Sequence, residues 1–190
     1  MKKIILTFIL MAAVFGCSSG SGNEEITLVD QVTDSEQIFT IEDFKQIGFK
    51  QSKKYKVEDL PGATAAFYGF IKNKLDPKDD KIDFEIRFYA NHADAVQMGT
   101  EPVANATGLD ACVDKYCALW KEDLKQRVML AELGVASFHA GSGKVIPKYY
   151  NYVIYGNMIL MCPGWTEEDA MERCSKTVFE LVPSLLLPTE

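Results

Sequence analysis

The stretch KYYNYVIYGNMILMC, residues 148–162, decides the fold more than any other part of the chain. Two runs rich in β-branched and aromatic residues lie on either side of the pair Gly156-Asn157. Glycine in the first position of a two-residue loop is typical of a type II′ turn, which joins antiparallel strands. The stretch therefore predicts a tight β-hairpin.

A helix is predicted directly after this hairpin. Thr166 is a suitable N-cap, Asp169 follows at the capping-box position, and Pro183 ends the helical pattern. Cys174 lies on the apolar stripe of this helix, so we expect its side chain to face the sheet.

The same order of strand, strand and helix is predicted over residues 63–99. Residues 63–72 and 82–90 have the composition of strands, and residues 82–90 alternate apolar and polar side chains. Asn91 is a suitable N-cap for the helix that follows. We therefore expect one α+β domain over residues 26–190, with an antiparallel sheet of four or more strands built from two hairpin–helix units and the helices packed on one face.

Two further helices are predicted outside these units. A short one begins after Thr40, which forms a capping box with Asp43, and it ends at Gly48. A longer helical stretch is predicted over residues 109–133, where apolar residues recur at helical spacing.

The composition excludes several classes of protein. The 190 residues include 20 Lys and Arg against 27 Asp and Glu, for a net charge of −7. A protein that binds nucleic acid by neutralising phosphates needs a basic excess, so nucleic acid is excluded as a partner. The hydrophobic share of 47% lies in the ordinary globular range, which excludes collagen-like and broadly disordered chains.

The N-terminal residues resemble the export signal of a bacterial lipoprotein. An apolar run over residues 4–15 follows two lysines, and it is too short for a permanent membrane helix. Val14-Phe15-Gly16-Cys17 is similar to a lipobox, which implies cleavage before Cys17 and acylation of its thiol. The resemblance predicts a signal peptide over residues 1–16 and a lipidated, Gly/Ser-rich tether over residues 17–25.

The predicted location is extracytoplasmic, with the lipid anchor in the cell membrane or the outer membrane. Removal of the two lysines with the signal leaves 18 basic and 27 acidic residues, a net charge of −9. Such an acidic body is repelled by anionic lipids, so the acyl chains are expected to supply the membrane attachment.

Four cysteines remain in the body of the chain, and in an exported protein they predict two disulfides. Three pairings are open for Cys112, Cys117, Cys162 and Cys174. On one continuous helix the first two would point about 140° apart and could not bond, so either they close a loop or each reaches a different element. A zinc site of four thiolates is the alternative, but it lacks the usual short Cys-x2-Cys spacing.

The sequence assigns no catalytic residue, metal site or cofactor. His92 is expected to bond locally at the start of a helix, and Glu85 is expected to pair with Arg87 two positions further along its strand. A Ser/His hydrolytic site near residues 137–144, with Ser137 and His139, is the alternative to a binding role.

Aromatic residues of the hairpin are the candidate binding surface. Strand alternation places Tyr150 and Tyr152 on one face and Tyr149 and Tyr155 on the other, so one pair is expected to point away from the helices. Exposed tyrosines suit sugars, peptides or a protein partner, whereas cross-strand packing is the structural alternative. Trp165 is expected to close the edge of the sheet.

Three parts of the body resemble the extracellular sensor domains of some bacterial Ser/Thr kinases and related lipoproteins. They are FYANHADAV (residues 88–96), Trp120 with the nearby Cys112 and Cys117, and the unit that runs from YGNMILM (residues 155–161) to Cys174. The resemblance implies a non-catalytic ligand-binding or interaction module whose partner is a small ligand, an envelope polymer or a protein. A structural envelope protein is a further alternative.

Overall fold

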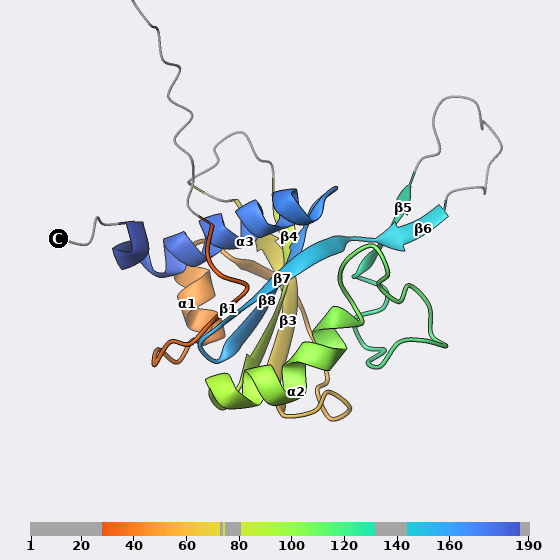
Figure 1. Cartoon of the computed structure of the whole chain (residues 1–190), viewed down its shortest axis with the longest axis horizontal. Helices are drawn as coiled ribbons and strands as arrows, with labels where there is room; N and C mark the ends of the chain where they lie inside the picture. Colours follow the sequence, from red (N-terminus) through yellow and green to blue (C-terminus); the bar gives the residue numbers. More distant parts are fainter. Residues whose placement is uncertain (1–27, 73, 75–80, 132–143, 187–190) are drawn as a thin grey trace, which may run out of the picture.

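The computed structural model describes residues 28–72, 74, 81–131 and 144–186 (Figure 1). In chain order the elements are β1 (Val32–Thr33), α1 (Ile41–Gln46), β2 (Lys50–Lys54), β3 (Ala63–Ile71), β4 (Ile82–Tyr89), α2 (His92–Ala104), β5 (Val128–Ala131), β6 (Lys144–Pro147), β7 (Tyr149–Tyr155), β8 (Met158–Pro163), α3 (Glu167–Leu181) and a short 3₁₀ helix (Pro183–Leu186).

Six strands form one sheet in the order β1-β7-β8-β4-β3-β2. Neighbouring strands are antiparallel except for β1, which runs parallel to β7. Strands β5 and β6 pair separately as a two-stranded ladder, which projects from the sheet beyond the start of β7 (Figure 1). The prediction of a mixed α+β fold with a mainly antiparallel sheet is therefore confirmed.

The hairpin of β7 and β8 has the predicted turn. Gly156 has a φ of +54°, and no non-glycine residue in the described ranges has a positive φ, as a type II′ turn requires. The Asn157 side chain is buried, where it accepts a hydrogen bond from Phe39 N at 2.7 Å and donates to Tyr89 O at 3.0 Å. The turn is thus tied both to the end of β4 and to the segment that leads into α1.

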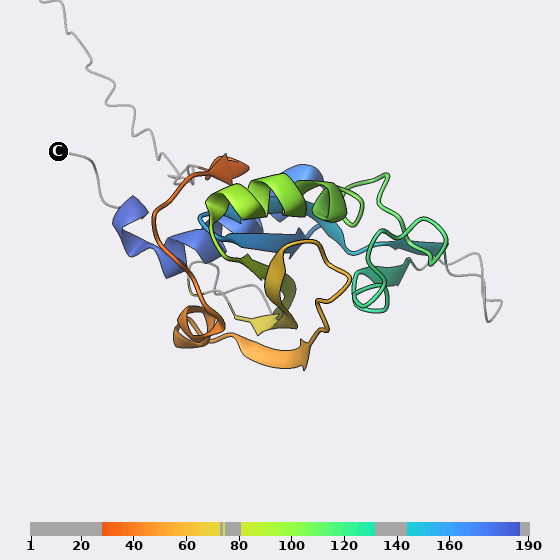
Figure 2. The same ribbon diagram turned by 90° about the horizontal axis from the view of Figure 1, so that it is seen from below.

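The prediction that all helices pack on one face is wrong, because the sheet is apolar on both faces. On β8, Leu160 and Cys162 point toward α1 and α3 and belong to the larger core cluster. Ile159 and Met161 point the other way and pack with α2. Figures 1 and 2 show α2 on the side of the central strands opposite to α1 and α3.

The predicted helix caps are confirmed, but the helix predicted over residues 109–133 is wrong for residues 109–131, the part that the structure describes. Thr40 forms the capping box of α1, and Asn91 and Thr166 cap α2 and α3. Residues 105–127, which we call the covering segment, form turns and bends, and β5 follows them. None of the helices in the described ranges has the length and apolar character needed to span a bilayer.

Candidate functional site

A pocket of about 210 Å³ opens at the end of the sheet where β8 leads into α3. Its walls come from the start of β4, from β5, from the junction of β6 and β7, from the end of β8 and from α3. The lining residues are Asp83, Met129, Lys148, Pro163, Gly164, Trp165 and Arg173. The pocket therefore combines three charged side chains with apolar and aromatic surface, as ligand sites commonly do.

The charges in this pocket do not cancel. Lys148 Nζ bonds to Asp83 Oδ2, and the Tyr68 hydroxyl donates to the same oxygen at 2.9 Å. Burial, with a further contribution from Asp83, raises the pKa of Tyr68, so this hydroxyl remains a donor at neutral pH. Arg173 forms no ion pair with any residue of the described ranges, which leaves one uncompensated positive charge at the pocket.

Trp165 lines this pocket with a largely exposed side chain. It was expected to close the edge of the sheet, but 65% of its surface is exposed, whereas Trp120 is 2% exposed. Trp165 follows Pro163-Gly164 and precedes the N-cap of α3, so its side chain lies in a connection rather than on a core-facing strand or helix. Its position between two elements was the only feature of the sequence that could have indicated an exposed side chain.

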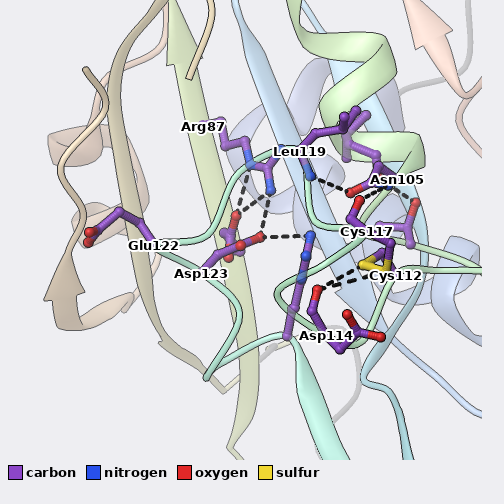
Figure 3. Close-up of polar contacts among 12 residues, drawn as sticks. Arg87, Asn105, Cys112, Asp114, Cys117, Leu119, Glu122 and Asp123 are labelled. Atoms are coloured by element: carbon purple, nitrogen blue, oxygen red, sulfur yellow. Dashed lines mark hydrogen bonds and ion pairs between the residues drawn. A yellow bond between two sulfur atoms is a disulfide. The ribbon is translucent and has the colours of Figure 1, made fainter. Parts of the chain in front are cut away.

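A buried group of charges lies behind the pocket on the same face of the sheet. Arg87 on β4 contacts Glu85 Oε1 at 2.8 Å and Asp123 Oδ2 at 3.0 Å, and Arg127 Nη1 lies 3.6 Å from Asp123 Oδ2. Figure 3 shows Asp123 pointing from the covering segment toward Arg87. The pairing of Glu85 with Arg87 was predicted, whereas the contribution of Asp123 and Arg127 was not.

Aromatic packing and one backbone hydrogen bond connect this charged group to its surroundings. The Trp120 ring lies 5.0 Å from the Arg87 guanidinium and makes an edge contact with Tyr55. The Lys148 amide donates to Arg127 O at 2.8 Å. Since Lys148 lines the pocket, the end of the covering segment helps to fix the position of a pocket residue.

Burial controls the ionisation of the charged group. It raises the pKa of Glu85 to about 7, although the positive charge of Arg87 opposes the shift. Burial also raises the pKa of Asp123, against the charges of Arg87 and Arg127. For Arg87, burial disfavours the charged form, but Glu85 and Asp123 outweigh it and raise the pKa, so this guanidinium stays protonated.

The four cysteines form two disulfides, which confirms that prediction and decides the pairing. Cys112 bonds to Cys117, with Cα atoms 5.7 Å apart, and closes a loop in the covering segment. Cys162 bonds to Cys174 and joins β8 to α3 inside the core. With all four sulfurs in disulfides, the zinc alternative has no thiolate ligands.

One comparison with known proteins identifies a family. The model of a family described as "family of unknown function (DUF6810)" matches residues 40–183. The chain belongs to the DUF6810 family. The matched stretch contains the pocket, the covering segment and both disulfides. No curated protein and no solved structure matches the chain.

The tyrosines of the hairpin do not form one exposed surface in this DUF6810 chain. A β-bulge between Tyr149 and Asn151 shifts the alternation, so Tyr149 and Tyr152 pack in the cluster that contains α2, while Tyr150 and Tyr155 pack in the larger core. Tyr149 and Tyr155 are buried, and the other two are half-buried. The prediction that Tyr150 and Tyr152 share one face and Tyr149 and Tyr155 the other is therefore wrong, because the bulge changes which side chains share a face.

The remaining candidates are His92 and three positions outside the described ranges. The prediction that His92 bonds locally is wrong, because its Nδ1 lies 3.0 Å from Gly156 O, 64 positions further along the chain, and the ring contacts the hairpin turn. Cys17, Ser137 and His139 lie outside the described residues.

Proposed function

We propose that this DUF6810 protein is an extracytoplasmic lipoprotein, held on the cell membrane or the outer membrane through Cys17, whose domain is a non-catalytic ligand-binding or interaction module. The observation that carries the binding role is the pocket with exposed Trp165 beside Lys148 and Arg173. A large exposed aromatic side chain beside charged groups offers contact area that the core does not use.

The pocket is built on elements that hold its walls in place. Pro163 ends β8, Arg173 lies on α3, and the buried disulfide joins these two elements next to both residues. A site on rigid elements loses less conformational entropy when a ligand binds, which supports a preformed binding pocket.

The charged side chains of the pocket suit binding better than acid–base chemistry. Lys148 is held by Asp83, and the planar guanidinium of Arg173 offers only hydrogen-bond donors, which suit an anionic group. A hydrolase with Ser137 and His139 is the alternative function, but both residues lie outside the described ranges and no contact of the described residues favours it.

Two features of the sequence and the structure support the proposed location. The lipobox-like residues 14–17 supply the acylation site, and two disulfides within one small domain are typical of proteins in oxidising compartments. A tethered, disulfide-bonded domain is a suitable form for a protein that meets ligands outside the cytoplasm.

Metabolic labelling with a palmitate analogue in a bacterial host tests the anchor. The wild-type protein is expected to incorporate the label and to fractionate with membranes, while Cys17→Ala loses both properties. Ser18→Ala is the matched control, because it changes the neighbouring residue and keeps the acylated thiol. Labelling that persists in Cys17→Ala would contradict the proposed anchor.

Native mass spectrometry of the exported protein, never reduced, tests the binding role. We expect a protein four hydrogens lighter than the same protein after reduction, and an additional mass that leaves on denaturation. A protein that carries no such mass and binds none of the ring compounds described below would contradict a ligand-binding pocket.

A further inference from the structure

We infer that the pocket at the junction of β8 and α3 selects small anionic ligands in which a carboxylate or similar group is attached to a single six-membered ring. In this assignment Arg173 binds the anionic group and Trp165 stacks on the ring. The inference rests on the proposed binding function and names the chemical class of its ligand.

The preference for an anion follows from the charges that line the pocket. Asp83 is already bonded to Lys148 Nζ and to the Tyr68 hydroxyl, so its negative charge is compensated. Arg173 has no ion-pair partner among the described residues. The net charge of the lining is therefore +1 in a chain whose net charge is −7, and a planar guanidinium matches a carboxylate with two parallel hydrogen bonds.

The three acidic residues in the first turn of α3 do not reverse this preference. Glu167, Glu168 and Asp169 are exposed and do not line the pocket. Their charges are screened by solvent, whereas a bound anion would contact Arg173 directly.

The ring is assigned from Trp165 and from the size of the pocket. Met129, Pro163 and the exposed indole of Trp165 supply apolar surface on the same pocket. At about 210 Å³ the pocket is smaller than the roughly 300–1,000 Å³ that hold drug-sized ligands. One ring with one charged group fits this volume, and both an aromatic acid and an acidic sugar have that chemistry.

Fluorescence titration of the full-length protein in mild detergent tests the inference. The chain has two tryptophans, and since Trp120 is buried, a ligand at the pocket is reported by Trp165. Benzoate and glucuronate are titrated to about 10 mM, which detects dissociation constants in the low-millimolar range. Benzyl alcohol and glucose are their neutral partners.

We expect at least one acid to give a saturable signal with a Kd about tenfold lower than that of its neutral partner. Arg173→Gln should remove this difference, and Trp165→Phe should remove the signal. Lys56→Gln is the matched control, since Lys56 is an exposed cation at the opposite end of the sheet, and it should leave the Kd unchanged. Equal melting temperatures of the variants would separate lost binding from lost folding.

Two results would overturn the inference. Equal binding of the acid and its neutral partner would show that the pocket does not select anions, while the binding function would stand. No saturable signal from any of the four compounds would refute the assigned ligand class, and native mass spectrometry would then decide the binding function by itself.

Discussion

Replacement of Arg87 by methionine is expected to be among the most destabilising single changes in the domain. The Arg87 side chain is fully buried and contacts the carboxylates of Glu85 and Asp123 at 2.8 and 3.0 Å. Arg87→Met keeps most of the side-chain volume but leaves Glu85 without its cation, while Asp123 keeps only the longer contact to Arg127. Removing one partner of a buried ion pair costs about 3–5 kcal/mol, because the remaining charge stays desolvated.

Urea unfolding followed by tryptophan fluorescence measures this cost. A domain of this size has a free energy of unfolding of about 5–15 kcal/mol, so the loss should be large and measurable. Lys45→Gln is the control, since it removes an ion pair with Glu42 of similar length, 2.7 Å, that is exposed to solvent. That change should cost about 0.5 kcal/mol or less.

Two further measurements separate lost charge compensation from lost packing. The cost of Arg87→Met should be smaller at pH 7 than at about pH 9, because the pKa of Glu85 is about 7 even beside Arg87, and without this cation Glu85 and Asp123 keep their protons to higher pH. The double variant Glu85→Leu with Arg87→Met should be more stable than Arg87→Met alone, since it also removes the stranded carboxylate. A cost of about 1 kcal/mol or less for Arg87→Met, or a cost independent of pH, would refute this account.

Three further predictions concern pH, redox and the hairpin turn. The pKa of Glu85 rises from 4.5 to about 7 on folding, so the folded state binds more protons than the unfolded state between these pH values. The free energy of unfolding should therefore increase by at most about 3 kcal/mol as the pH falls from 7 to 4.5, which urea unfolding at each pH measures. Under mild reduction with alkylation and mass spectrometry, the disulfide of the covering segment, which has one exposed cysteine, should open before the fully buried one; simultaneous opening would contradict the burial difference. Gly156→Ala should lower stability by more than Gly108→Ala, since both positions have positive φ but only at Gly156 would the new Cβ lie 2.7 Å from a backbone oxygen; equal losses would mean that backbone strain alone decides.

Local chemistry explains why much of the fold could be predicted from the sequence. The turn at Gly156 and the caps Asn91 and Thr166 are decided by residues within three or four positions of one another. A tight turn needs a glycine that can adopt positive φ, and a helix cap needs a side chain that accepts a hydrogen bond from the third helical residue. Both patterns can be recognised within a few consecutive residues.

The covering segment could not be predicted in this way, because its structure depends on residues far away in the chain. Trp120 and Asp123 have a spacing that suits one face of a helix, yet each contacts Arg87, which lies 36 positions before Asp123. Helical spacing is a weak preference that such tertiary contacts override. The bulge after Tyr149 is a second case, since one extra residue exchanges the faces of the tyrosines without changing the composition of the strand.

The alternation of β4 shows most clearly what a periodic pattern can establish and what it cannot. A period of two correctly places Glu85 and Arg87 on the face opposite to Phe84 and Ile86, but it does not predict whether that face is exposed to solvent. Here the covering segment buries that face, so Glu85 and Arg87 are buried charges rather than solvated ones. The ion pair between Arg87 and Asp123 holds the segment in place. The hydrogen bond from the Lys148 amide to Arg127, at the end of the segment, in turn holds one wall of the pocket. The site therefore depends on two features that no single window of sequence contains, which is why the pocket had to be found in the structure.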